Sequence, residues 1–165
     1  MPQNDKALLS RLKEHRVEFV IIGGVCGVLH GVPLVTLDLD ICCPFSRENL
    51  RCIETALKDL HPRHRLTADK LPLELTDALC GRLKNIYLNT DLGNLDCLSE
   101  VSGVGDYQQA LRQSVSYGMS CGELRILSLD ALIKSKSAVG REKDLNAVRL
   151  LQAIKEKREQ QKDLF

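Results

Sequence analysis

Asp38 and Asp40 are two carboxylates separated by one residue, in the segment Leu37-Asp38-Leu39-Asp40-Ile41. The strict alternation predicts a strand with three aliphatic side chains on one face and both carboxylates on the other. Their Cα atoms would lie about 6.6 Å apart, two strand rises, so the carboxylates can converge on one site. Because like charges repel, either solvent screens them, as on any outward strand face, or a hard divalent cation bridges them.

Asp96 lies in a second alternating segment, Asn94-Leu95-Asp96-Cys97-Leu98, on the side opposite Leu95. If this segment pairs beside the strand of Asp38, three carboxylates share one face of the sheet. Three carboxylates suffice to hold two Mg²⁺ ions about 3.5–4 Å apart, and such ions activate a hydroxyl for in-line attack on a phosphoryl group. The residues therefore favour metal-assisted phosphoryl-group chemistry.

The pair Gly23-Gly24 ends an apolar run, residues 17–22, whose continuity predicts a strand buried on both faces. A helix that starts directly after this strand leaves backbone N–H groups free at the positive end of its dipole, which suits a phosphate. Tight packing of the turn explains the same glycines equally well. Neither G-x-G-x-x-G nor G-K-[ST] occurs here, so a Rossmann or P-loop site is not supported.

The elements that must position these residues alternate along the chain. Helices are expected over residues 5–15, 46–60 and 107–113, after Gly24 as far as Pro33, and from Ser128 and Arg141 onward. Strands are expected over residues 17–22, 37–41, 84–90 and 95–98, and as two short runs within 114–127. Residues 61–82 receive no assignment, and residues 101–105 are expected as a loop. The hairpin at 84–98 excludes a purely parallel sheet, so the predicted fold class is α+β (α/β), a mixed β-sheet with helices packed on it.

Length and composition bound the protein further. The chain has 165 residues, 44% of them apolar, so we expect one domain over residues 1–165. The final helix should bury Leu145, Val148, Leu151 and Ile154. The charged tail from residue 155 should fray. A net charge of +1 gives no global field for nucleic acid or an anionic membrane. The longest apolar stretch, residues 17–31, contains Glu18, His30 and several glycines, so it is neither a signal peptide nor a membrane span.

Cysteine usage points to a reducing compartment. The seven cysteines include no C-x-x-C pair and have no histidine at zinc-finger spacing, which argues against a disulfide framework or a zinc site. Most lie in apolar runs, where a free cysteine behaves as a small hydrophobic residue. We therefore expect a soluble, cytoplasmic protein.

The motifs also occur in a recognisable order. The chain reads Ile22-Gly23-Gly24, His30-Gly31-Val32-Pro33, Thr36, Asp38-Leu39-Asp40, then Gly93-Asn94-Leu95-Asp96, and finally Lys136 eight residues before Asp144 in Gly140-Arg141-Glu142-Lys143-Asp144. This order resembles the nucleotidyltransferase superfamily typified by polymerase β, and is closer still to its small bacterial branch of minimal and abortive-infection-type nucleotidyltransferases. The resemblance runs from about residue 19 to residue 151.

The resemblance implies an enzyme that uses Mg²⁺ or Mn²⁺ and an NTP substrate. Gly23 and Gly24 would hold the triphosphate, and Asp38 and Asp40 would bind the metal. Asp96 would complete the metal site and help to activate the acceptor hydroxyl. The resemblance therefore makes these three aspartates the expected catalytic residues.

The same resemblance implies nucleotide contacts from Thr36, Lys136 and Asp144. From the residues alone, an ordinary solvated helix face is the favoured interpretation of Lys136 and Asp144, with Arg141 to Asp144 as a salt-bridge cluster near the helix start. The chain also departs from the branch, which often has Arg at the position of Leu34 and a polar residue at that of Leu37. Loss of the Arg removes a cation that faces phosphate.

Two hypotheses remain open at this point. In the first, the protein moves an NMP from an NTP to an acceptor hydroxyl, and pyrophosphate leaves. In the second, a nucleotidyltransferase-fold protein without turnover serves as a binding or partner module, such as one half of a toxin–antitoxin pair. The missing Arg favours the second hypothesis, and the three aspartates favour the first. The sequence indicates no RNA-binding surface, because only 4% of the residues are aromatic and the net charge is nearly neutral. Three classes of acceptor therefore remain open: a tRNA or other RNA end, a protein side chain and a small molecule. No DNA partner and no membrane partner is indicated.

Overall fold

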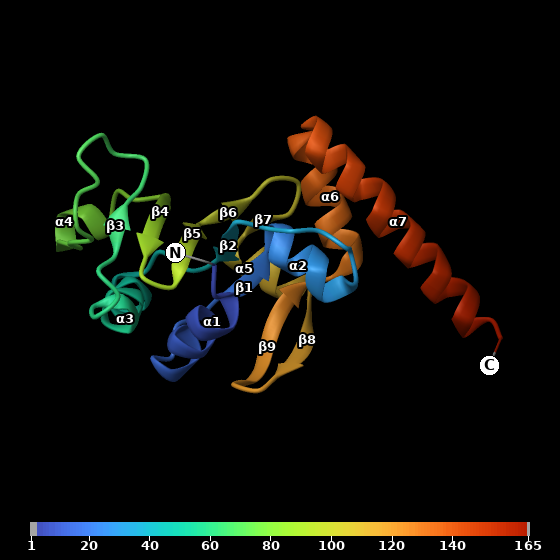
Figure 1. Cartoon of the computed structure of the whole chain (residues 1–165), viewed down its shortest axis with the longest axis horizontal. Coiled ribbons are helices and arrows are strands. Elements are labelled where there is room, and N and C mark those ends of the chain that lie inside the picture. The colour runs from blue at the N-terminus through green and yellow to red at the C-terminus, as the bar shows by residue number, and fades with distance from the viewer. Residues whose placement is uncertain (1–2, 165) are drawn as a thin grey trace.

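The computed structural model describes residues 3–164, which form an α+β fold (Figure 1). The helices are α1 (Asp5–Glu14), α2 (Gly23–His30), α3 (Arg47–Leu57), α4 (Asp77–Cys80), α5 (Tyr107–Arg112), α6 (Leu129–Val139) and α7 (Glu142–Lys162). The strands are β1 (Val20–Ile22), β2 (Asp38–Cys42), β3 (Arg63–His64), β4 (Asn85–Thr90), β5 (Gly93–Leu98), β6 (Glu100–Val101), β7 (Gly105–Asp106), β8 (Ser114–Met119) and β9 (Gly122–Leu127).

The main sheet is mixed, as predicted. Its strand order is β3-β4-β5-β2-β1-β9-β8, and β6 and β7 form a separate two-stranded ribbon. β2 runs parallel to β5 and antiparallel to β1, whereas β4 and β5 form the predicted antiparallel hairpin. Figure 1 shows α3 and α4 at one end of the molecule and α6 and α7 at the other, with α7 extending from the body to the C-terminus. The two carboxylate-bearing strands therefore lie in the middle of the sheet.

One face of these central strands is fully buried. Leu39 and Ile41 of β2 and Leu95 of β5 have no solvent exposure, and they belong to one hydrophobic cluster with the buried leucines of α1 and α3. Burial of each such side chain contributes about 1.5–3 kcal/mol. A slip of one residue would exchange these side chains for Asp38 and Asp40, so the packing specifies a register in which the carboxylates face away from this core.

The strand and helix ends differ in detail from the predictions. β1 covers only three residues of the expected 17–22 run, although Val17 and Phe19 are buried beside it. α3 begins after the predicted cap Ser46 but ends before Leu60, because the Leu60 N–H bonds to the carbonyl of Leu57 and closes a tighter turn. Residues 101–105, expected as a loop, include the paired ends of β6 and β7. The unassigned segment 61–82 contains β3 and α4.

Two predicted burials are wrong. Leu37 is 75% exposed because β2 begins only at Asp38, so two aliphatic side chains rather than three face the core. Leu145 is 45% exposed, since the buried stripe of α7 starts one residue earlier and comprises Asp144, Ala147, Val148 and Leu151.

The charged segment from residue 155, expected to fray, is helical as far as Lys162. Lys155 Nζ lies 2.8 Å from Asp130 Oδ1 of α6, and an Arg158 Nη2 donor reaches the His30 carbonyl at 3.0 Å. These contacts hold α7 against α6 and the C-terminal end of α2. Within residues 3–164, no helix is both long enough and apolar enough to cross a membrane.

Candidate active site

The parallel pairing of β2 and β5 brings the three aspartates together. Asp40 is the register partner of Asp96, and Asp38 is the partner of Asn94. Because paired positions in neighbouring strands project to the same side, the three carboxylates share the sheet face opposite the core. The predicted arrangement of the three side chains on one face is therefore confirmed.

Arg65 joins this group from a segment that the sequence left unassigned. Its backbone N–H bonds to the Tyr87 carbonyl at 3.0 Å, which continues the pairing of β3 with β4. Its guanidinium carbon lies 5.7 Å from the centre of the Tyr87 ring, and Nη2 donates to both carboxylate oxygens of Asp96. The same nitrogen lies 3.8 Å from Asp38 Oδ2. A cation thus already occupies one side of the carboxylate group.

The three carboxylates have unequal partners. Asn94 Nδ2 donates to Asp38 Oδ1 at 2.7 Å, and Arg65 holds Asp96. Across the described chain, no side chain makes a hydrogen bond or ion pair with the carboxylate of Asp40. The pKa of Asp40 is raised from 3.8 to about 6, chiefly by burial and then by the negative charges of Asp96 and Asp38, against the opposing effect of Lys136 and Arg65. Asp40 is therefore the carboxylate that most lacks a cation.

Asp96 is the most deeply placed of the three, with 9% of its side chain exposed. Burial raises its pKa, and the hydrogen bond and charge of Arg65 offset only part of that increase. This balance shows that the arginine pairs with a carboxylate that would otherwise be poorly solvated.

The backbone approaches the carboxylates most closely at Gly23. Gly23 has a φ of +66°, and a Cβ atom built there would lie 2.8 Å from Asp40 Cγ, too close for any other residue. A Cβ atom at Gly24 would lie 3.0 Å from Thr36 Cβ. α2 begins at these glycines without a side-chain cap, so its first N–H groups remain available to an anion.

Positive side chains come from the other side, where α6 meets the start of α7. Lys136 Nζ lies 3.9 Å from Asp144 Oδ1, and Arg141 Nε donates to Asp144 Oδ2 at 2.6 Å. Burial alone would raise the pKa of Asp144, but the hydrogen bond from Arg141 and the charges of Arg141, Lys136 and Lys143 outweigh it and lower that pKa. Asp144 thus neutralises and orients cations, including the salt bridge considered from the sequence.

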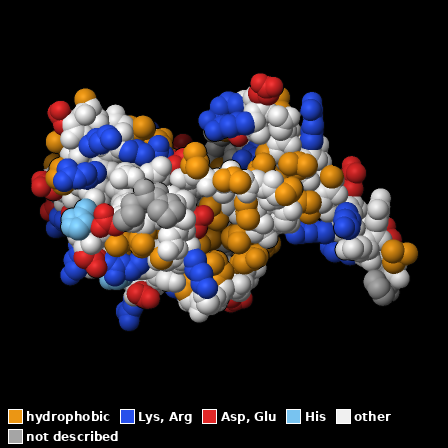
Figure 2. All heavy atoms as spheres, viewed as in Figure 1, with side chains coloured by type: hydrophobic (Ala, Val, Ile, Leu, Met, Phe, Trp, Pro, Cys, Tyr) orange, Lys and Arg blue, Asp and Glu red, His pale blue; other side chains and the backbone are white. Residues whose placement is uncertain are grey.

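A cavity of about 360 Å³ joins the two sides. All the sequence-predicted site residues except Asp96 line it; its lining comprises Gly23, Gly24, Leu34, Val35, Thr36, Leu37, Asp38, Asp40, Lys136, Arg141, Lys143, Asp144 and Ala147. Figure 2 shows Lys and Arg side chains gathered over the start of α7 and hydrophobic side chains below them, over α2 and the segment that follows it. Glycines, carboxylates, cations and an apolar wall therefore surround one space.

The donor chemistry of this site suits Mg²⁺, although its third ligand is engaged. Carboxylate oxygens are the ligands that Mg²⁺ prefers, and the partly buried Asp40 has no cation of its own. In the part of the chain that the structure describes, no three His, Cys, Asp or Glu side chains are arranged to hold a metal ion. Asp38 and Asp40 therefore fit the ion, whereas Asp96 is bound to Arg65.

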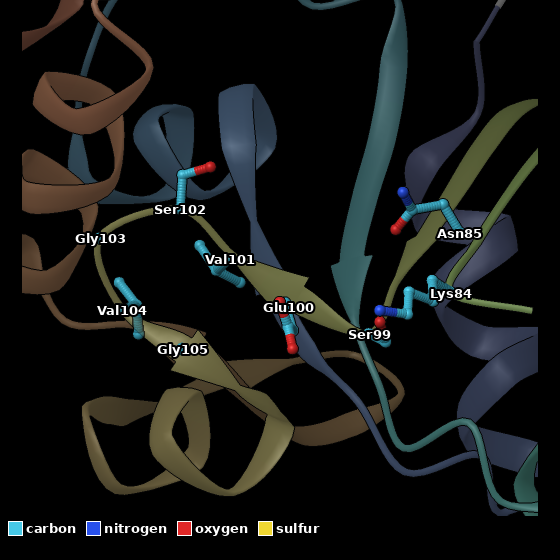
Figure 3. Close-up of a pocket in the computed structure, with 9 residues that line it drawn as sticks. All are labelled: Lys84, Asn85, Ser99, Glu100, Val101, Ser102, Gly103, Val104 and Gly105. Atoms are coloured by element: carbon cyan, nitrogen blue, oxygen red, sulfur yellow. The ribbon is translucent and has the colours of Figure 1, made fainter.

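A second hollow, of about 560 Å³, lies between the start of β4 and the β6–β7 ribbon (Figure 3). Its polar side chains come from Lys84, Asn85, Ser99, Glu100 and Ser102. Asn85 lies two residues before Tyr87, the register partner of Asp96, so it projects to the carboxylate face. One residue of this hollow, Asn85, therefore shares a sheet face with the carboxylates.

Sequence reasoning missed several residues of the site. Asn94 had a usable signal, because it precedes Asp96 by two residues in the same alternating strand. Arg141 and Lys143 were seen only as parts of a motif, although they line the cavity. Arg65 had no signal, since nothing local indicates that residues 61–82 fold back over β4.

The fold is similar to that of several solved structures, although the sequence itself matches no known family. Neither a family model nor a curated protein matches the sequence. Among solved structures, the chain is similar to ANT(2'')-Ia in complex with adenylyl-2''-tobramycin, at 16% identity and a TM-score of 0.56 over 89% of this chain and 84% of that one. The solution structure of the antibiotic-resistance factor ANT(2'')-Ia matches with 16% identity and a TM-score of 0.58, over 89% and 80% of the two chains.

A Thermotoga maritima protein with a provisional nucleotidyltransferase assignment matches similarly. Its identity is 18% and its TM-score 0.56, over 88% of this chain and 87% of that one. The chain therefore has the fold of the nucleotidyltransferase superfamily, as the order of motifs predicted.

Proposed function

We propose that the protein is a Mg²⁺-dependent nucleotidyltransferase that moves an NMP from an NTP to an acceptor hydroxyl. The observation that carries the proposal is the 360 Å³ cavity, in which the Gly23-Gly24 helix start, two carboxylates and Lys136 meet. A triphosphate needs free N–H groups and cations, and a metal needs carboxylates. These requirements are met on opposite walls of one space.

Each wall has its part in the proposed reaction. The N–H groups at the start of α2 bind phosphate oxygens, and Lys136 offsets phosphoryl charge. Arg141 and Lys143 supply the positive charge that Leu34 cannot, while Leu34 and Val35 form an apolar surface suited to a nucleobase.

Asp38 and Asp40 would hold the metal, which when bound polarises the phosphoryl group and makes the acceptor hydroxyl more acidic. The acceptor oxygen forms a bond to the α-phosphorus as the bond from that phosphorus to the bridging oxygen breaks. Pyrophosphate leaves with those electrons, and the hydroxyl proton would pass to a carboxylate, a role that we assign to Asp96.

The acceptor would approach from the hollow beside β6 and β7. Its amide, hydroxyl and charged side chains suit a polar group, and Asn85 borders both the hollow and the carboxylate face. An RNA end, a protein side chain and a small molecule remain candidate acceptors. The adenylyl-2''-tobramycin complex of a structural neighbour supports the small molecule.

Calorimetry of NTP binding tests the nucleotide site. Gly24→Val should abolish binding, because the new side chain fills the space between α2 and Thr36, and Lys136→Ala should weaken it about tenfold through loss of a charged contact. Gly118→Val and Lys134→Ala are the matched controls: a Cβ at Gly118 meets nothing within 4 Å, and Lys134 is an exposed residue of the same helix. Circular dichroism verifies the fold. Unchanged affinity in both site variants would move the nucleotide elsewhere.

A second candidate function is a module without turnover, for which the pairing of Arg65 with Asp96 is the specific support. Such a module would act through a partner, as in a toxin–antitoxin pair, and Val35 and Leu37, 94% and 75% exposed, offer apolar contacts beside the cavity. NTP binding without any nucleotide transfer would favour this function. Leu34→Arg is then the direct check, because gain of transfer would show that the carboxylate site lacked only a phosphate-facing cation.

A further inference from the structure

Arg65, Tyr87, Asp96 and Asp40 form one continuous row across four neighbouring strand positions. Arg65 follows β3 and bonds to the Tyr87 carbonyl, Tyr87 is the register partner of Asp96, and Asp96 is the partner of Asp40. Side chains at partner positions share a face. The arginine therefore reaches the carboxylates along the surface of the sheet, across the Tyr87 ring.

Arg65 is embedded in this row. Only 24% of its side chain is exposed, and its Nε is buried without a hydrogen-bond partner. A guanidinium with an unsatisfied buried donor is held there by attraction to the carboxylates, since it gives up water for only part of its hydrogen-bonding capacity. Both oxygens of Asp96 accept from the same nitrogen, Nη2. No oxygen of Asp96 is left without this cation.

We propose that Arg65 and a divalent cation compete for Asp96. Arg65 pairs with this carboxylate in the metal-free protein and must leave it before Asp96 can join Asp38 and Asp40 as a ligand. The inference rests on the proposed function, because it takes the metal site from there. It adds a residue that sets the affinity of that site from outside its ligand set.

The surroundings of Arg65 make such an exchange feasible. The face of the Tyr87 ring is already in contact range of the guanidinium and can keep it as a cation–π partner after Asp96 is released. Asp38 Oδ2, at 3.8 Å, is a weaker partner that is also available. β3 is a two-residue strand at the edge of the sheet, and the neighbouring Leu66 is 67% exposed, so the segment that carries Arg65 borders solvent.

Mn²⁺ binding to the whole protein without nucleotide tests the proposal, measured by calorimetry and by the electron paramagnetic resonance signal of free Mn²⁺. Arg65→Gln should bind Mn²⁺ about tenfold more tightly than the wild type, because the ion no longer displaces a charged hydrogen-bond donor. Arg65→Lys, which keeps the charge but has a smaller, more strongly hydrated head group, should lie between the two. Arg63→Gln is the matched control, since Arg63 is exposed and its Nη1 donates only to the Lys70 carbonyl at 3.3 Å.

A second measurement needs no variant. The NMR resonance of Arg65 Nε should shift during a Mg²⁺ titration, with the same midpoint as metal binding. Equal or weaker Mn²⁺ affinity in Arg65→Gln, with native circular dichroism, overturns the competition and makes Arg65 a residue that positions Asp96. An unmoved Nε resonance at saturating Mg²⁺ also overturns it. Absence of Mn²⁺ binding in the wild type and all variants would remove the metal from the proposed function as well, so the two failures are distinguishable.

Discussion

Asp40 of β2 lies directly opposite Asp96 of β5, in the centre of a seven-stranded sheet. The two residues are 56 positions apart in the sequence, and the parallel pairing of their strands makes them neighbours. The buried leucines on the other face fix the register, so this proximity does not depend on any attraction between the carboxylates. The fold thus holds two like charges together at a cost that a cation can relieve.

That cost should appear in the stability of the metal-free protein. Asp40 has a folded-state pKa of about 6 against 3.8 for the ordinary group, so between these values the folded state binds more protons and stability falls as pH rises. Asp40→Asn should remove this contribution to the fall and make the protein more stable at pH 7, by on the order of 2 kcal/mol. Urea unfolding in EDTA at pH 4.5 and pH 7 measures both effects.

Asp69→Asn, in an exposed part of segment 61–82, provides the comparison and should leave the profile unchanged. A wild type whose stability changes with pH between 4.5 and 7 just as that of Asp40→Asn does, with no gain for the variant at pH 7, would show that the carboxylates do not repel one another.

Gly23 should tolerate no side chain. Alanine there must adopt a φ of +66° and place its Cβ against Asp40, so Gly23→Ala should lose about 1–3 kcal/mol of unfolding free energy from backbone strain alone. Gly118→Ala, at an open position on β8, should change stability little. Urea unfolding of both variants decides the matter; equal stabilities would mean that the turn between β1 and α2 relaxes freely.

His30 gives the protein a separate sensitivity to acid. Burial lowers its pKa below 6.5, and so does the charge of Arg158, while the hydrogen bond from Nε2 to the Leu127 carbonyl, 2.7 Å long, opposes them. Below pH 6.5 the unfolded state therefore binds the extra proton first, so His30 contributes stability above that pH that is lost as pH falls.

His30→Gln should accordingly lose less stability than the wild type between pH 7 and pH 5.5. Thermal unfolding at the two pH values measures the difference, and His64→Gln controls for the loss of an imidazole as such. A steeper loss in His30→Gln than in the wild type would contradict the buried, neutral histidine.

The features that could be predicted from the sequence are those that depend on local residue patterns. Alternation in the segments around Asp38 and Asp96 gives both strands and their polar faces, and the caps Ser46 and Ser128 mark helix starts that the structure reproduces. The turn chemistry at residues 91–94 gives the hairpin, and with it the mixed sheet. Each of these features depends on side-chain period or capping, which a sequence records directly.

The rest depends on tertiary contacts that no local pattern encodes. Arg65 acts on Asp96 from 31 residues away, through a two-residue strand in a segment without periodicity. Leu37 fits the alternation of β2 but lies before the first ladder pair, so it faces solvent. Motif order suggested the roles of Lys136 and Asp144, whereas only the packing of α6 against α7 shows that they pair with each other.

Transfer of an α-labelled nucleotide is the measurement that tests the account most directly. The protein would be incubated with each α-³²P-labelled NTP, Mg²⁺ or Mn²⁺, and separate pools of cellular RNA, protein and small molecules. The account predicts label in one pool, release of pyrophosphate, loss of transfer in Asp96→Asn with most of the NTP affinity retained, and loss of both metal response and transfer in the Asp38→Asn, Asp40→Asn double variant. NTP binding without label in any pool, under every donor and metal, would contradict it.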